Sequence, residues 1–205
     1  MSKLVLSSGV QNQSDNSAFN ARGGKTGELM VGHAHGKYYE AASRGGLFMA
    51  QAIVTAPVIW TTEAGTGGPL LWNGTSTVNA VILAVGFGTS VVTTVAAALG
   101  LTGGNGQTAA PTSTTAIDSS TNLLIGGAAS QCTAYRVGTT VENDFFLPFA
   151  QVHTGALTVD TTGMQWVDLQ GMIVVPPNSF VSVAASATAS TLVGNFALIW
   201  EEVAI

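Results

Sequence analysis

Residues 78–101 read VNAVILAVGFGTSVVTTVAAALGL, and this stretch decides between two very different folds. Its length matches a membrane-spanning helix, which needs roughly 20 mostly apolar residues. Its many β-branched residues favour strands, and threonines and glycines interrupt the apolar run. The nearest basic residues are Arg44 and Arg136, so no positively charged flank would orient it across a bilayer. We therefore predict strands here and no membrane span.

The low charge of this stretch extends over a much longer part of the chain. No charged residue occurs from Ala64 to Ile117, and Asp118 is the only one before Arg136. Charged residues make up 8% of the 205 residues, whereas about a quarter is usual for soluble proteins. A chain of this kind must bury much of its outer surface against other proteins. We therefore predict a symmetric homo-oligomer, and a trimer is the expected form.

Charge is also distributed unevenly between the two parts of the chain. Residues 1–44 carry five basic and three acidic residues, whereas residues 45–205 carry Arg136 alone against eight acidic residues. An acidic body with one basic residue cannot neutralise a phosphate backbone. We therefore expect no nucleic-acid partner.

Short apolar runs separated by turn residues fill the sequence after residue 48. This spacing is typical of an antiparallel β-sandwich or barrel, and no stretch shows a sustained helical period. Gly88-Thr89 and the sequence Asp168-Leu169-Gln170-Gly171 are expected to end strands. The expected strands are Ala50–Val58, Pro69–Trp72, Val78–Phe87, Ser90–Leu99, Asn122–Ile125, Cys132–Val137, Gln151–Val159, Met164–Leu169, Met172–Val175, Phe180–Ala187 and Thr191–Val203.

The N-terminal part differs from this pattern. Residues 7–27 are small and polar without periodicity, so we expect an extended arm that orders on contact with a neighbour. Glu40 and Arg44 have the i,i+4 spacing of a helical turn, which Gly45-Gly46 would end. The predicted organisation is an arm with a short turn or helix over residues 1–47, followed by a β-sandwich domain over residues 48–205.

Two histidines in the arm suggest a metal site as an alternative. His33 and His35 would point to the same side of a strand, and Glu40 follows. With Gly27, this stretch resembles the first motif of the cupins, a glycine followed by two histidines and a glutamate. The glycines beside the histidines indicate a loop rather than a rigid strand, and surface or interface histidines are the simpler interpretation.

The second cupin motif is matched only in part. Pro148 and His153 have the right spacing, but Ala150 stands in place of the glycine and Leu157 in place of the asparagine. We therefore expect no metal and no cofactor, with His33, His35, Glu40 and His153 as the candidate ligands if a metal binds.

No residue set indicates catalysis, so we expect a protein that is not an enzyme. Cys132, the single cysteine, lies in an apolar context and is expected to pack as a small hydrophobic residue. The four tryptophans lie in separate strands, where packing explains them better than a sugar-binding platform. Exposed tryptophans would favour a carbohydrate-binding receptor protein instead.

Two stretches resemble virion proteins of tailed bacteriophages. They are KTGELMVGHAHGKYYEAASRGGLFMAQ at 25–51, and GMIVVPPNSFVSVAAS at 171–186 with FALIWEEV at 196–203. The resemblance implies a jelly-roll β-sandwich, trimeric or higher, on the outside of a capsid. A capsid decoration (cement) protein that contacts the major capsid protein is the expected role, and a head-fibre or tail receptor-binding component is the alternative. The expected location is the virion, assembled in the host cytoplasm.

Overall fold

The computed structural model describes residues 37–55, 57, 59–61, 66–91, 96–106, 111, 113–116, 121–139, 143–152, 164–187 and 192–205. The chain divides into two units, Met1–Tyr39 and Glu40–Ile205. The second unit contains every strand described below. The predicted extended arm lies mostly outside the described residues, so the division between arm and sandwich stays a prediction.

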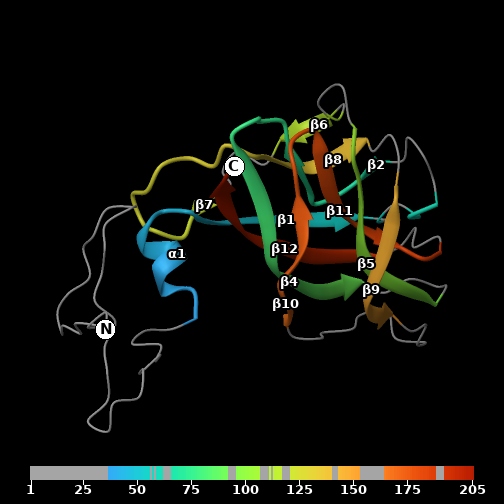
Figure 1. The fold of residues 1–205 in the computed structure, drawn as a ribbon. Coiled ribbons are helices and arrows are strands. Elements are labelled where there is room, and N and C mark those ends of the chain that lie inside the picture. Colours follow the sequence, from blue (N-terminus) through green and yellow to red (C-terminus); the bar gives the residue numbers. More distant parts are fainter. Residues whose placement is uncertain are drawn as a thin grey trace, which may run out of the picture. The chain divides into compact units, whose positions relative to one another are not determined.

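Two antiparallel sheets form the second unit, and Figure 1 shows their strands. The five-stranded sheet has the order β10 (Gln165–Val175), β4 (Val78–Val91), β12 (Val193–Ala204), β1 (Leu47–Thr55), β7 (Thr121–Asn122). The seven-stranded sheet has the order β2 (Thr66–Gly67), β8 (Thr133–Thr139), β3 (Leu70–Asn73), β11 (Ser179–Ala185), β5 (Ala97–Gly104), β9 (Phe145–Val152), with β6 (Ser113–Ala116) paired to β8.

The order of eight of these strands is that of a jelly roll. One sheet contains the series β10-β4-β12-β1, and the other contains β9-β5-β11-β3. The chain crosses between the sheets at most steps, because β3, β5 and β11 each neighbour in sequence a strand of the opposite sheet. The prediction of an antiparallel β-sandwich of jelly-roll type is therefore confirmed. Double-sheet jelly rolls occur in capsid proteins, lectins and cupins, so the fold alone does not indicate one function.

The core lies between the two sheets and is almost entirely apolar. Trp200 on β12 is fully buried and stacks on Phe48 of β1, with 5.9 Å between the ring centroids. Val181 and Val183 of β11 face them from the opposite sheet and are also fully buried. Buried aromatic residues of this size contribute most of the hydrophobic free energy of a small sandwich.

Strand β4 is longer than the sequence indicated. Gly88-Thr89 was expected to end a strand, but β4 continues through both residues to Val91. A Cβ atom at Gly88 would make only an ordinary contact, 3.4 Å from the Met164 Cα atom, so the packing there does not require glycine. The expected strand Ser90–Leu99 is therefore two elements, since β5 begins only at Ala97.

Strand β10 is also continuous where a turn was expected. Its pairing with β4 shifts register between Asp168 and Ile173, which indicates a bulge within one strand. Gln170 and Gly171 have positive φ values of 52° and 81°, and Gln170 donates its backbone N–H to Asp168 Oδ1 at 3.0 Å. The bulge turns Leu169 into the core, where it is 3% exposed.

The helical turn predicted from Glu40 and Arg44 is confirmed. Helix α1 (Tyr39–Ser43) is followed by Gly45, which has the left-handed φ of 71°. The Gly46 N–H donates to the Ala41 carbonyl at 3.0 Å, as in a glycine C-cap. The Arg44 guanidinium lies 3.7 Å from the Glu40 carboxylate.

A buried asparagine ties the two sheets together at one end. Asn73, at the end of β3, is 0% exposed and donates from Nδ2 to the Val78 carbonyl at 2.8 Å and the Val175 carbonyl at 2.9 Å. Its Oδ1 accepts hydrogen bonds from the N–H and hydroxyl of Thr75. Because the Nδ2 atom is buried and bonded to both carbonyls, the Asn73-Gly74-Thr75 sequon has a structural role in this fold.

Candidate interaction surface

The outer face of the seven-stranded sheet is covered within the chain. Side chains that point away from the core on β3, β11 and β5 are nevertheless buried: Leu70 is 0%, Phe180 2% and Ala184 0% exposed. The ring of Phe146 on β9 lies against Gly100, where a Cβ atom would come within 2.6 Å of it, and Trp60 stacks on Phe146 at 5.7 Å. This face therefore behaves as a second, smaller core.

The outer face of the five-stranded sheet is open along its β10 edge. Trp166 is 51%, Met172 73% and Val174 49% exposed, and all three are on the side of β10 away from the core. Val174 pairs with Val81 of β4, which extends the same face. Among the described residues of this face only Asp168 and Glu201 are charged. We call Trp166, Met172 and Val174, together with Met164 just before β10, the outer patch.

The outer patch packs on the backbone of β4 at Gly86, where no side chain intervenes. A Cβ atom on Gly86 would lie 2.9 Å from the Trp166 ring and 3.0 Å from the Met164 methyl carbon. The tryptophan ring therefore packs directly on the backbone of β4 and leaves about half of its surface exposed. A large apolar ring held in this way presents contact area at little cost in conformational entropy on binding.

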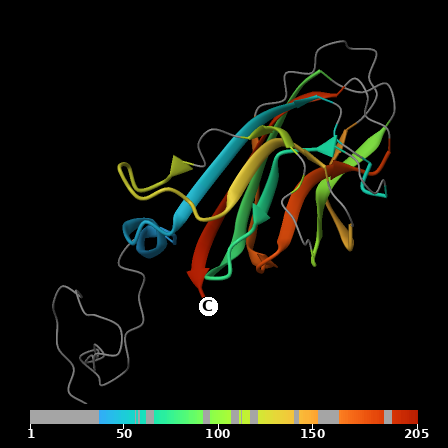
Figure 2. The same cartoon turned by 90° about the horizontal axis from the view of Figure 1, so that it is seen from above.

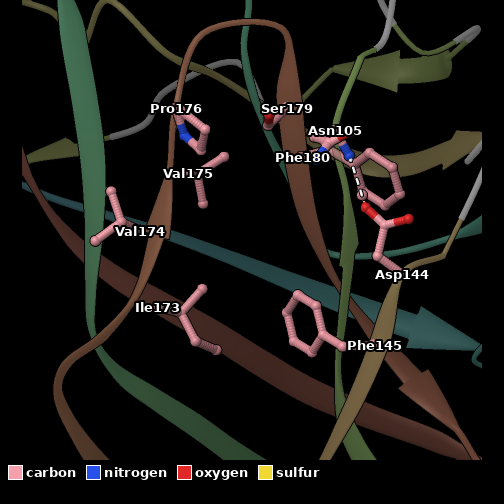
Figure 3. A pocket seen from close by; sticks show the side chains of 10 residues that line it. Asn105, Asp144, Phe145, Ile173, Val174, Val175, Pro176, Ser179 and Phe180 are labelled. Carbon is pink, nitrogen blue, oxygen red and sulfur yellow. Dashed lines mark hydrogen bonds between the residues drawn. The ribbon is translucent and has the colours of Figure 1, made fainter.

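A small cavity opens between the sheets beside β10. It has a volume of about 280 Å³ and is lined mainly by apolar residues of β10, β11 and β9, and by Asn105 and Asp144. Figure 3 shows Ile173 and Val175 on one side and Phe145 on the other, whereas Val174 points away toward β4. Asp144 Oδ2 accepts a hydrogen bond from the Asn105 N–H at 3.1 Å. We call this cavity the edge notch.

An apolar loop follows β7 at the other edge of the same sheet. Leu123 is 37%, Leu124 40% and Ile125 99% exposed. Figure 2 shows the loop projecting beyond β1. The sequence pattern predicted a strand over Asn122–Ile125, but the strand ends at Asn122. We call Leu123, Leu124 and Ile125 the knob.

Several hydrogen bonds hold the knob in one conformation. Asn122 is 9% exposed, and its Nδ2 donates to the carbonyls of Gly45 and Ala128, each at 2.8 Å. Its Oδ1 accepts from the Leu124 N–H, and the Gly127 N–H closes a turn on the Leu124 carbonyl. Gly126 supplies the positive φ of 83° that this turn needs.

A carboxylate fixes the chain that returns from the knob. Glu202 on β12 accepts hydrogen bonds from the backbone N–H groups of Gln131 and Cys132 and from the Ser130 hydroxyl. These contacts join the segment before β8, in one sheet, to β12 in the other. The knob is therefore anchored on both sides, by Asn122 and by Glu202.

Cys132 lies next to this carboxylate and is 3% exposed. Burial, and in addition the nearby negative charge of Glu202, raises the pKa of the Cys132 thiol to about 12. A thiol with this pKa is protonated at neutral pH and is a poor nucleophile. The prediction that Cys132 packs as a small hydrophobic residue is confirmed, since it belongs to the core.

The candidate metal ligands are not brought together by the described residues. His33, His35 and His153 lie outside them, and Glu40 on α1 is exposed with Arg44 as its neighbour. No group of three histidine, cysteine, aspartate or glutamate side chains suited to a metal ion occurs within the described ranges. The described residues do not test the alternative of a metal site; elemental analysis of the purified protein, with a His33→Ala, His35→Ala variant as the control, tests it.

The tryptophans divide between packing and exposure. Trp200 is 0% exposed, Trp60 and Trp72 are partly buried, and only Trp166 is more than half exposed. The neighbours of Trp166 in the outer patch are methionines and valine, which suit a protein contact better than the polar groups of a sugar.

The stretch that resembled a membrane span forms strands. Residues 78–91 belong to β4 and residues 97–101 to β5. Within the described ranges, no helix has the length and apolar character needed to cross a membrane.

The sequence contained a signal for the knob that the strand pattern obscured. Gly126-Gly127 directly follows three large apolar residues, and a glycine pair of this kind indicates a turn. The edge notch had no such signal, because its walls come from β9, β10 and β11, which are distant in sequence.

Comparison of the chain with protein-family models, curated proteins and solved structures finds no match.

Proposed function

We propose that this protein is a structural component of a tailed-bacteriophage virion, a decoration protein that binds the outside of the capsid as a symmetric homo-oligomer. The observation that carries the proposal is the outer patch, where Trp166, Met172 and Val174 remain about half exposed or more on a sheet face whose only charged residues in the described ranges are Asp168 and Glu201. Surfaces of this kind, when contiguous, mark protein–protein contacts.

Two further observations support a structural role. The jelly roll is a fold that capsid proteins use, and the stretches at 25–51 and 171–203 resemble phage virion proteins. The described interior is filled with apolar side chains, and its buried polar residues are asparagine, serine and threonine. A scaffold for subunit contacts needs a rigid, well-packed interior of this kind and no reactive groups.

Immunogold labelling of virus particles from cells that carry the gene tests the proposal. Label distributed over the head surface supports capsid decoration. Label confined to the tail or to a single fibre favours the receptor-binding alternative. Purified particles without the protein contradict both roles.

The N-terminal segment supplies a second test. We propose that residues 2–24 contact the capsid or a neighbouring subunit, because their polar composition favours ordering only on contact. Deletion of these residues is expected to weaken binding to particles while the oligomer stays intact. Equal decoration by the truncated protein would contradict a role for the arm.

A further inference from the structure

We propose that the subunits of the homo-oligomer join head to tail, with the knob of one copy seated in the edge notch of the next. This inference rests on the proposed oligomer and names the contact that builds it. It is carried by the positions of the two features, by their chemistry and by the rigidity of the knob.

The positions suit a contact that repeats around a ring. The knob follows β7, at one edge of the five-stranded sheet, and the notch is lined by β10, at the opposite edge of the same sheet. With the knob and its complement on opposite edges, each copy can place its knob on one neighbour and receive the knob of another neighbour in its notch, which is a heterologous contact. Such heterologous contacts close into rings or extend into filaments.

The chemistry of the two surfaces is complementary. The knob consists of three aliphatic side chains, and the sequence from Thr121 to Tyr135 carries no charge. The notch has a volume of about 280 Å³, room enough for a branched aliphatic side chain, and is lined by Ile173 and the partly exposed Phe145 together with the buried residues Val175 and Phe180. The carboxylate of Asp144, at the notch, already accepts a hydrogen bond from Asn105, so an uncharged occupant leaves that carboxylate paired.

The knob is also held in one conformation before it binds. Ile125 is almost completely exposed, so the loop presents apolar surface to water. The loop is nevertheless held in place by hydrogen bonds of Asn122 on one side and of Glu202 on the other. A preorganised contact loses little conformational entropy on binding. This arrangement is expected of an anchor residue and is unusual for a loop whose only task is to connect two strands.

The outer patch is part of the same contact, because the knob and the notch alone bury too little area for a specific interface. A specific interface buries about 800 Å² on each partner, and three side chains supply only part of this. Val174 links the two features, since its side chain lies in the outer patch while its chain segment lines the notch. A neighbour seated in the notch would therefore extend over the outer patch.

Two single variants and their mixture test the arrangement. Ile125→Asp places a charge on the knob, and Phe145→Asp places one in the notch. Each variant is expected to be monomeric by light scattering, because each lacks one half of every contact. Mixed in equal amounts they should form one-to-one dimers, since each supplies the half that the other lacks. Ala129→Asp, a charge on the same loop away from the tip, should keep the wild-type oligomer.

A second variant covers the possibility that Phe145→Asp does not fold. Asn105→Trp fills the mouth of the notch from an exposed position and leaves the core unchanged. It should also be monomeric, and it should form dimers when mixed with Ile125→Asp.

Disulfide cross-linking provides an independent readout. Cysteines at Ile125 and Phe145 in one chain should link subunits under mild oxidation, and buried Cys132 should not compete. A disulfide-linked dimer of Ile125→Cys alone would place two knobs together and overturn the head-to-tail arrangement. A wild-type oligomer that persists in Ile125→Asp would also overturn it while leaving the proposed oligomer standing. A monomeric wild-type protein would contradict both.

Discussion

The outer faces of the two sheets have similar composition but different surroundings. On the seven-stranded sheet, Leu70 and Phe180 point away from the core and are still no more than 2% exposed. On the five-stranded sheet, Trp166 and Met172 point away from the core and are 51% and 73% exposed. Both faces are poorer in charged residues than an ordinary solvent-facing sheet, and the described part of the five-stranded face has only Asp168 and Glu201. A face with so little charge predicts that something covers it, and only the structure shows which face the chain covers by itself.

The largest expected effect comes from the covered face. Phe180→Ala should lower the free energy of unfolding by about 3–5 kcal/mol, because it removes a buried aromatic ring and leaves a cavity. Urea denaturation of the wild-type protein and the variant measures the difference. A loss below about 1 kcal/mol would show that this face is not a second core.

The next largest effect tests the link between the two sheets. Asn73→Ala removes the side-chain donor to the Val78 and Val175 carbonyls. It should lower the free energy of unfolding by about 2–3 kcal/mol, because both buried acceptors would lose this hydrogen bond. Thr75→Val is the matched control, because it removes only the hydroxyl that donates to Asn73 Oδ1. Thermal unfolding should place Thr75→Val between the wild-type protein and Asn73→Ala. Equal effects of the two variants would contradict the role assigned to Asn73 Nδ2.

A smaller effect appears only at alkaline pH, at the junction of β8 and β12. The pKa of Cys132 is about 12 in the folded protein, against the ordinary value of 9.0. Because the folded state disfavours the thiolate, this contribution to stability is complete below pH 9 and decreases as the pH rises toward 12. The unfolding free energy of the wild-type protein should therefore fall relative to Cys132→Ala over this range. Parallel pH profiles of the two proteins would refute the shift.

The smallest effect on folding is expected on the exposed face. Met172→Ser should change the stability of the isolated subunit by no more than about 0.5 kcal/mol, because the side chain is mostly exposed. The same change should weaken subunit association measurably in sedimentation equilibrium. Unchanged association together with unchanged folding would remove the outer patch from the interface.

Much of the sandwich could be predicted from local sequence. Short apolar runs between turn residues located most strands, and the last strand, expected over Thr191–Val203, is β12 with nearly the same bounds. The jelly-roll order came from the resemblance to virion proteins, because strand pairing joins residues far apart in the chain. Turn residues within strands misled the pattern, since β4 continues through Gly88-Thr89 and the Asp168–Gly171 sequence forms a bulge within β10.

The interaction surface was less accessible to sequence reasoning. The pattern indicated that the outward sides of Val78–Phe87 and Ser90–Leu99 would be covered by another subunit. Val78–Phe87 lies in the sheet with the open face, whereas the end of the second stretch belongs to β5, in the sheet whose outer face the chain covers by itself. The pattern could not distinguish the two sheets, because the stacking of Trp60 on Phe146 depends on contacts between distant segments. The knob was interpreted as a strand, because three apolar residues alone do not distinguish a buried strand from an exposed turn.

The measurement that tests the account most directly is light scattering of the full-length protein at micromolar concentration. The account predicts a stable closed oligomer, a trimer or larger, with a mass that is a whole multiple of 20.8 kDa. A monodisperse species of 20.8 kDa would contradict it, because the exposed face of the five-stranded sheet would then have no partner of its own kind.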